Sequence, residues 1–236
     1  MIQRIREYGK KTPSRDAHII YIVCEGRKTE PQYFQFFENR FSSNLKVIPI
    51  PSKNGETDPV KLMERAQKDF FGDKRKYTVN YKRGDTIWFV IDTDEWEKGK
   101  TGSKISILRK FCKNQNESIP KIFDEIKQYD AWNVAQSNPC FEIWLYYHFE
   151  ENPPEDFEYT GKDSFKEYVD NAISGGFKPN IHPVFLKKAI KNASSNLKYD
   201  AKGKLCLYTT EVHLLGQEIY GFVKKSLDKL ETKVDK

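Results

Sequence analysis

Residues 19–30 read IIYIVCEGRKTE, and this stretch decides the fold. Its first six residues are apolar and rich in β-branched side chains, which is typical of a strand buried on both faces of a parallel sheet. The run ends at Glu25, and Gly26 permits a tight turn. Thr29, with Gln32 three residues later, matches a helix capping box. The stretch therefore predicts a strand, a turn and a helix, with Glu25 at the strand end where open α/β sheets bind ligands.

A second acidic strand end occurs at residues 86–94, which read TIWFVIDTD. Asp92 and Asp94 are two residues apart, so their side chains lie on the same side of an extended chain. If the two strands are neighbours, Glu25 meets this pair, and three carboxylates that close repel one another unless a proton or metal ion intervenes. Hard oxygen ligands suit Mg²⁺ (or Mn²⁺). The sequence thus predicts a metal site.

The order of elements predicts the α/β fold class, with a mostly parallel sheet flanked by helices. Besides the two acidic strands, we expect strands at 45–50 and 131–136. We expect helices over 30–41, over 59–70 with Asp58 as the cap, and over 103–113, 119–128, 164–174, 183–196 and 210–229.

Three regions are expected along the chain. Residues 1–17 form a flexible basic arm, residues 18–150 form the α/β domain, and residues 151–236 form a helical C-terminal region packed on it. The Pro-rich segment 152–154 marks the boundary between the last two regions.

Composition bounds the class of protein. A hydrophobic content of 38% with 31% charged residues describes a globular domain, and no run is long enough for a membrane span or a signal-peptide core, so a cytoplasmic protein is expected. The four cysteines show no CxxC spacing and the four histidines no HxxH, which disfavours zinc. The excess of Lys+Arg over Asp+Glu, 40 − 34 = 6, is compatible with nucleic-acid binding.

Further polar residues are candidates for the same sheet edge. Glu142 lies in an otherwise apolar helix after the fourth strand, and we expect it to reach the metal. Glu30 is a candidate for catalysis or for a favourable interaction with the helix dipole. Arg27 and Lys28 are placed to bind a phosphate or to form a solvated turn, and residues 95–102 carry two more lysines. These are Lys98 and Lys100.

Three motifs in order resemble the RloB-like family. They are residues 23–30 (VCEGRKTE), residues 92–95 (DTDE) and residues 137–149 (SNPCFEIWLYYHF). The resemblance spans roughly residues 19–150. It implies a Toprim-like (Rossmann-like) domain, the metal-binding module of primases, topoisomerases and certain nucleases. It also implies a role in anti-phage defence, beside restriction systems or paired with an ABC/AAA-type ATPase.

The resemblance also implies roles for individual residues. Glu25 matches the Toprim glutamate, a general acid/base or metal ligand, and Asp92 and Asp94 match the Mg²⁺-binding pair. Asn138 and Glu142 fall in the family's Asn-Pro-Cys-Phe-Glu segment. Near the C-terminus the family has an Asn-Pro-x-Thr-x-Val-His pattern. Here Thr210, Val212 and His213 match it, while Leu207-Tyr208 replace the Asn-Pro.

These features lead to one principal hypothesis and two alternatives. The principal hypothesis is a Mg²⁺-dependent nuclease that cleaves DNA or RNA phosphodiesters, alone or as a homo-oligomer. The first alternative is a non-catalytic partner subunit that binds nucleotide or nucleic acid and regulates an ATPase. The second is a HAD-type phosphatase with Asp92 as nucleophile, which is disfavoured because such a site normally follows the first strand of the chain.

Overall fold

The structure is a computed structural model of the chain and describes residues 16–53, 57–93, 102–122 and 129–234. Most of the predicted basic arm, together with Asp94, Lys98, Lys100 and the end of the helix expected over 119–128, lies outside these ranges.

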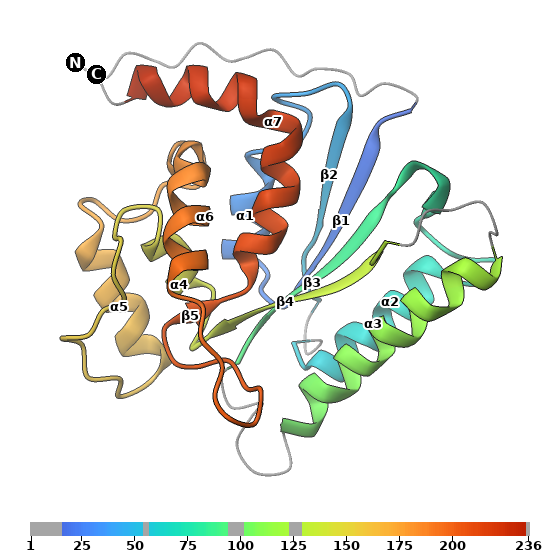
Figure 1. The fold of residues 1–236 in the computed structure, drawn as a ribbon, viewed down its shortest axis with the longest axis horizontal. Helices are drawn as coiled ribbons and strands as arrows, with labels where there is room; N and C mark the ends of the chain where they lie inside the picture. The colour runs from blue at the N-terminus through green and yellow to red at the C-terminus, as the bar shows by residue number, and fades with distance from the viewer. Residues whose placement is uncertain (1–15, 54–56, 94–101, 123–128, 235–236) are drawn as a thin grey trace.

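A five-stranded, mostly parallel sheet forms the centre of the molecule (Figure 1). Its order is β2-β1-β3-β4-β5, and only β5 runs antiparallel to its neighbour. The strands are β1 (His18–Cys24), β2 (Leu45–Ile50), β3 (Thr86–Asp92), β4 (Trp132–Asn138) and β5 (Thr209–Thr210). This topology confirms the predicted α/β fold class.

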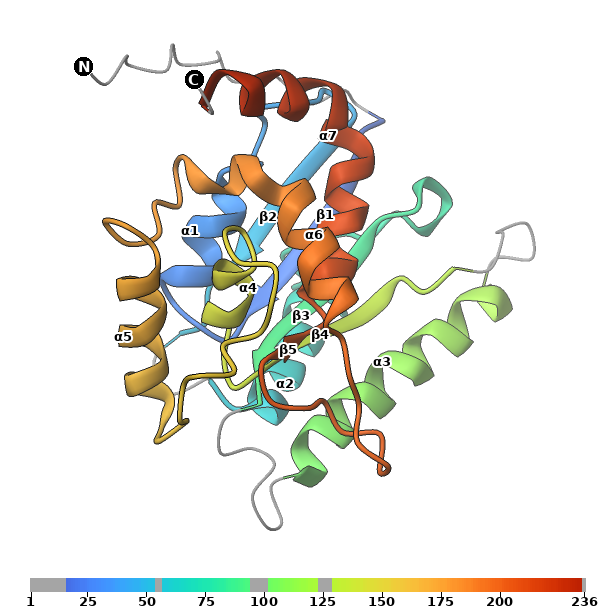
Figure 2. The ribbon, with the colours of Figure 1, turned by 60° about the vertical axis from the view of Figure 1, so that its left-hand side comes forward.

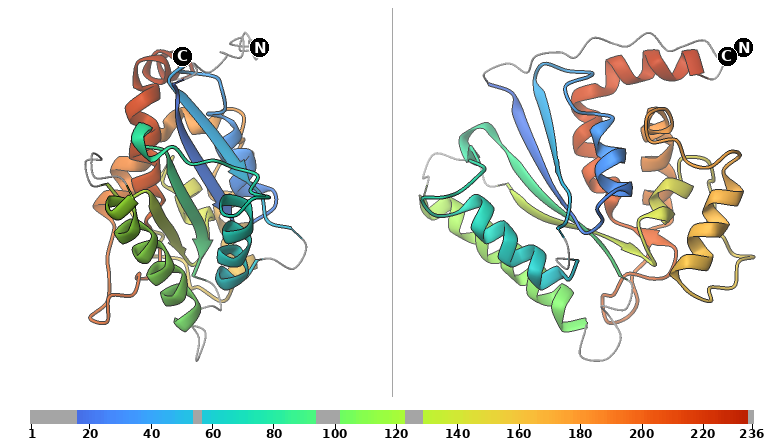
Figure 3. Two further views of the ribbon diagram at one scale, coloured as in Figure 1. Left: turned by 90° about the vertical axis from the view of Figure 1, so that its right-hand side faces the viewer. Right: turned by 180° about the vertical axis from the view of Figure 1, so that it is seen from behind.

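Helices cover both faces of the sheet (Figures 1 and 3). One face carries α2 (Pro59–Phe70) and α3 (Gly102–Ile122). The helices that pack on the other side are α1 (Thr29–Gln35), α4 (Glu142–Tyr146), α5 (Lys162–Ala172), α6 (Leu186–Ser195) and α7 (Val212–Val234). Short 3₁₀ helices occur at Tyr81–Arg83 and His182–Phe185. Figure 2 shows α6 and α7 side by side over the strands.

Strand β1 shows why the apolar runs are continuous. Ile20, Ile22 and Cys24 belong to the apolar cluster beneath α1 and α7. The alternate residues Tyr21 and Val23 belong to the cluster beneath α2 and α3. Because both faces are buried, burying an apolar side chain stabilises the fold by about 1.5–3 kcal/mol at each position. Apolar residues are therefore favoured along the whole strand.

Several element boundaries differ from the sequence-based predictions. Helix α1 ends at Gln35 and not near residue 41, and Thr29 is not its cap: Lys28 precedes the helix and no side chain caps it. The two helices expected over 103–113 and 119–128 are one helix, α3. In the middle of this helix the Asn116 side chain binds both the N–H and the C=O of Trp132, at 2.8 and 2.9 Å, and so fastens α3 to the start of β4.

The described part of the chain contains no helix that is both long and apolar enough to cross a membrane.

Candidate functional site at the carboxyl edge of the sheet

Glu25 and Asp92 lie side by side at the carboxyl ends of neighbouring strands. Strands β1 and β3 are parallel with Cys24 opposite Val90, so the residues after them arrive at the same edge. The Asp92 N–H donates a 2.9 Å hydrogen bond to Glu25 Oε2. Both residues are only 6% exposed. The structure therefore brings these two predicted site residues together.

Gly26 and Glu30 form the turn that follows β1. The Gly26 N–H donates to Glu30 Oε1 at 2.9 Å. A Cβ atom at position 26 would lie 2.0 Å from Glu30 Oε2, so any residue larger than glycine would displace the Glu30 carboxylate. Glu30 is buried, and burial raises the pKa of its carboxyl group, with further increases from the negative charges of Asp92 and Glu142. Glu30 is thus close enough to Asp92 and Glu142 to interact with them electrostatically.

Asp92 is held by two donors from distant parts of the chain. Its Oδ1 accepts from the Phe141 N–H at 2.9 Å, and its Oδ2 lies 2.6 Å from the Lys162 ammonium nitrogen. Burial raises the pKa of Asp92, the Lys162 charge lowers it, and the Glu142 charge raises it again. The Lys162 ammonium therefore supplies positive charge at the place where the sequence predicts a cation.

Glu142 approaches the same place from the first residue of α4. Its Oε1 lies 3.6 Å from Lys166 Nζ, one helical turn beyond Lys162 on α5. Burial raises the pKa of the Cys140 thiol, and the charges of Glu142 and Asp92 raise it further, as expected if both carboxylates lie near that sulfur. Burial and these charges keep Cys140 as a neutral thiol, a packed group and not a nucleophile.

The side chains gathered here are of the chemical type that binds a hard divalent cation. Four carboxylates, those of Glu25, Glu30, Asp92 and Glu142, surround the strand ends, with two ammonium groups as partners. Carboxylate oxygens are the ligands that Mg²⁺ and Mn²⁺ prefer. Within the described ranges, however, no three His, Cys, Asp or Glu side chains are already arranged to hold a metal. Binding would require Lys162 to give way, and Asp94, which lies outside those ranges, is an additional ligand candidate.

The remaining candidates lie at the periphery. Arg27 and Lys28 are exposed in the turn before α1. Asn138 ends β4, where its Nδ2 donates to the Leu205 carbonyl at 2.7 Å, which anchors the segment before β5.

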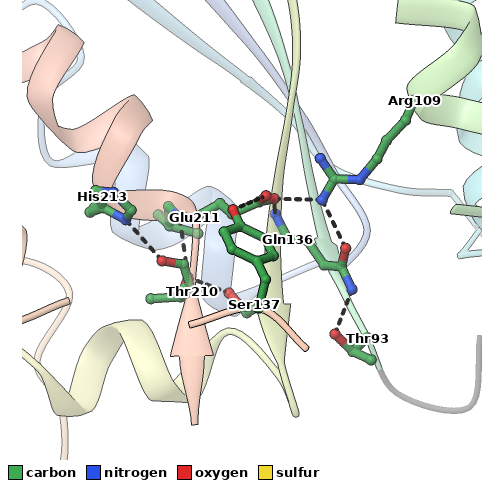
Figure 4. A network of polar contacts seen from close by, with 9 residues as sticks. Thr93, Arg109, Gln136, Ser137, Thr210, Glu211 and His213 are labelled. Carbon is green, nitrogen blue, oxygen red and sulfur yellow. Dashed lines mark hydrogen bonds and ion pairs between the residues drawn. The ribbon is translucent and has the colours of Figure 1, made fainter. Parts of the chain in front are cut away.

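A polar network lies next to the carboxylates at the β3–β4–β5 edge (Figure 4). Glu211 is 5% exposed, and its Oε2 accepts from Arg109 Nη2 at 2.6 Å and from the Gln136 N–H at 3.0 Å. Gln136 Nε2 donates to the hydroxyl of Thr93, the residue after Asp92, at 2.7 Å. These hydrogen bonds link β3, β4 and the segment after β5, so the network fixes the strand ends beside Asp92.

The same network contains the residues that match the family's C-terminal pattern. The Thr210 hydroxyl pairs with Ser137 Oγ at 2.8 Å, and His213 Nδ1 lies 2.9 Å from the Thr210 carbonyl. His213 is buried, and burial lowers its pKa. These contacts are internal to the fold and give His213 a structural role.

Sequence reasoning did not identify Lys162 and Lys166. They lie four residues apart at the start of a helix, a spacing that puts both ammonium groups on one face. That spacing was the available signal, but nothing local links this helix to Asp92.

Comparison with known proteins supports the resemblance seen in the motifs. A family model described as RloB-like protein matches residues 20–219, a range that includes all four carboxylates and both lysines. Neither the curated proteins nor the solved structures produced a match. Since the family model covers most of the 236 residues, the chain belongs to the RloB-like protein family.

Proposed function

We propose that this protein is a Mg²⁺- or Mn²⁺-dependent nuclease of the Toprim type that acts on nucleic-acid phosphodiesters as the effector of an anti-phage system. The observation that carries the proposal is the hydrogen bond between Glu25 and Asp92 at neighbouring strand ends, where the charge of Glu142 also acts on Asp92 and the charge of Asp92 acts on Glu30. Carboxylates are gathered this closely where a cation or a proton is to be held.

Each residue has a role in this proposal. Asp92, Asp94 and Glu142 would hold the ion, which when bound polarises a phosphoryl oxygen and favours ionisation of water. Glu25 would take or give a proton at a carboxylate oxygen, as the resemblance implies. Glu30, whose pKa is raised by burial, is suited to keep a proton close by.

Positive groups would orient the substrate. Arg27 and Lys28 are exposed on the turn beside Glu25, and Lys98 and Lys100 follow Asp94 in sequence. Cations next to the carboxylates, such as Arg27 and Lys28, would offset the repulsion between those carboxylates and a phosphate backbone.

Cleavage assays test the proposal. Plasmid DNA and a tRNA pool would be incubated with the protein in Mg²⁺ or Mn²⁺, with and without an ABC/AAA-type ATPase. Glu25→Gln keeps the size and hydrogen bonding of the side chain but removes its basicity, so cleavage should fall at least a hundredfold with affinity unchanged, at the lower end of what general acid–base catalysis contributes (about 10²–10⁴-fold). Glu38→Gln, an exposed glutamate beyond α1, is the matched control. Wild-type cleavage by Glu25→Gln would refute this site.

A specific observation also favours a non-catalytic alternative. The Lys162–Asp92 pair neutralises the aspartate without a metal, as in a regulatory subunit that keeps its carboxylates for structure. Absence of cleavage in both metals, even with the ATPase present, would support that function, in which the chain binds nucleotide or nucleic acid for its partner.

A further inference from the structure

A basic pocket lies along α2, on the sheet face opposite α7. It is open to solvent, has a volume of about 460 Å³, and is hereafter called the α2 pocket. Six of its eight lining residues are basic, and two are acidic, Glu64 and Asp69, which gives a formal charge of 6 − 2 = +4. The basic residues are Lys53, Lys61, Arg65, Lys68, Lys74 and Lys76.

The floor of the α2 pocket contains one buried acidic residue, Asp69, with two basic partners. Asp69 is 4% exposed, and its carboxylate pairs with Lys76 and lies 3.5 Å from Arg65 Nε. Arg65 Nη1 also donates to the Pro51 carbonyl at 2.6 Å. The negative charge of Asp69 therefore offsets the charges of Arg65 and Lys76 and not those of the other lysines.

Three lysines around the rim have no acidic partner in the described ranges. Lys53, Lys68 and Lys74 are exposed and make no ion pair with any residue in the described ranges. Like charges gathered on one surface destabilise a fold slightly through mutual repulsion. A polyanion that covers them would remove this repulsion and release its own counterions.

The α2 pocket is joined to the turn that carries Glu25. The Ser52 N–H donates to the Gly26 carbonyl at 3.3 Å, and the adjacent Pro51 carbonyl is the acceptor for Arg65. Residues 51–53 thus connect the end of β2 with both the turn and the pocket. Figure 3 shows α2 running back along the sheet from this edge.

The lining identifies the class of ligand. Every lining residue is charged, so the pocket offers no aromatic ring on which a base could stack. Helix α2 has 12 residues and is about 18 Å long, which exceeds the size of one phosphate group. Lys61, Arg65 and Lys68 lie on one face of it at i, i+4 and i+7.

We propose that the α2 pocket binds several consecutive phosphates of a nucleic-acid strand and directs that strand to the carboxylates at Glu25 and Asp92. This inference rests on the proposed function, since it assigns that site a substrate path.

Salt-dependent binding tests the inference. The triple variant Lys53→Gln/Lys68→Gln/Lys74→Gln is compared with wild type and with the control Lys224→Gln/Lys225→Gln/Lys229→Gln, which removes three exposed charges from α7. Fluorescence anisotropy with a labelled DNA duplex and a labelled RNA hairpin, in EDTA, gives log K against log salt. The slope of the α2 variant should fall by about 2–3 for at least one probe, since each lost phosphate contact removes about 0.7–0.9, and the control should match wild type.

An unchanged slope for both probes, or an equal loss in the α7 control, would overturn the inference. The α2 variant is also titrated with ATP. A loss of ATP affinity with no change in nucleic-acid binding would overturn the inference too and would assign the pocket to a small polyphosphate. Because the assay contains no divalent metal, its result is separate from the cleavage assay. A reduced slope with no cleavage would retain the pocket and reject the nuclease, whereas cleavage with an unchanged slope would do the reverse.

Discussion

At residue 26 the backbone comes so close to the Glu30 carboxylate that any larger residue would have to displace it, and this contact links the site to the stability of the fold. Gly26→Ala should cost about 1–3 kcal/mol, because the new methyl group meets a buried, hydrogen-bonded carboxylate. Gly221→Ala is the matched control: no atom lies within 4 Å of a Cβ there, and in the middle of α7 alanine should gain about 0.5–1 kcal/mol. Urea denaturation measures both.

A double variant checks the cause of the Gly26→Ala loss. Gly26→Ala with Glu30→Ala removes the group that the methyl meets, so its destabilisation should be smaller than the sum of the two single changes. Additive losses would show that the strain at position 26 has another origin.

His148 provides a pH-dependent prediction at the same scale. Its Nδ1 lies 2.9 Å from the Trp144 carbonyl and its Nε2 lies 3.1 Å from the Tyr33 hydroxyl, and full burial lowers its pKa to about 3. The nearby charges of His182 and Lys188 lower it further, while its backbone hydrogen bonds partly raise it. The folded state therefore keeps His148 neutral where the unfolded chain takes up a proton.

The sign of the pH effect follows from this difference. As pH falls from 6.5 toward 3, the unfolded state gains a proton and the folded state does not, so His148 costs stability at up to about 1.4 kcal/mol per pH unit. His148→Gln should unfold less steeply with acid than wild type, although it starts from a lower stability. Parallel curves of unfolding free energy against pH would contradict a buried neutral imidazole.

Among the elements, α7 makes its polar contacts with β1 and β3 through Glu218. Glu218 Oε1 accepts from His18 Nε2 at 2.8 Å and from the Thr86 hydroxyl at 2.6 Å, and its Oε2 accepts from Trp88 Nε1 at 2.7 Å. Glu218→Ala should cost about 2–4 kcal/mol, because three partly buried donors lose their acceptor. Asp228→Ala, which deprives only Tyr220 of an acceptor, should cost less than about 1.5 kcal/mol by thermal or chemical denaturation. Equal losses would argue against the Glu218 anchor.

An element was predicted well where its own residues determine it and poorly where contacts with distant residues determine it. The runs at 19–24 and 86–92 predicted strands because burial on both faces demands apolar residues at every position, and Asp58 was correctly predicted to cap α2, where it accepts from the Val60 N–H at 2.8 Å. Strand β5 was not predicted, because two residues carry no periodicity and their pairing depends on Ser137 and Asn138. The apolar spacing predicts two helices over 103–113 and 119–128, whereas the structure has one helix, α3, in which Asn116 contacts Trp132, 16 residues away.

The same distinction applies to the candidate site. The meeting of Glu25 and Asp92 was predictable, because carboxyl ends of adjacent parallel strands share an edge. The lysine at Asp92 was not, because it comes from a helix far along the chain whose docking depends on packing. The α2 pocket was missed because Lys53 and Lys74 flank the helix that carries the other charges, and only the fold assembles them.

Across the whole molecule, acidic and basic groups gather in different regions, although the net charge is small. The net charge is only +6, yet the carboxylates gather at the strand ends while the α2 pocket carries a local excess of basic groups. Under the proposed function, phosphates would be held by one region and cut at another, and a metal ion would have to compete with Lys162 for Asp92.

Calorimetric titration of the protein with Mn²⁺ tests this account most directly, since it needs neither substrate nor partner. Wild type should bind the ion, Asp92→Asn should lose that binding, and Lys162→Gln should bind more tightly because no ammonium group has to be displaced from Asp92. If Asp92→Asn binds Mn²⁺ as wild type does, or if no variant binds it, the carboxylates at Glu25 and Asp92 are not a metal centre.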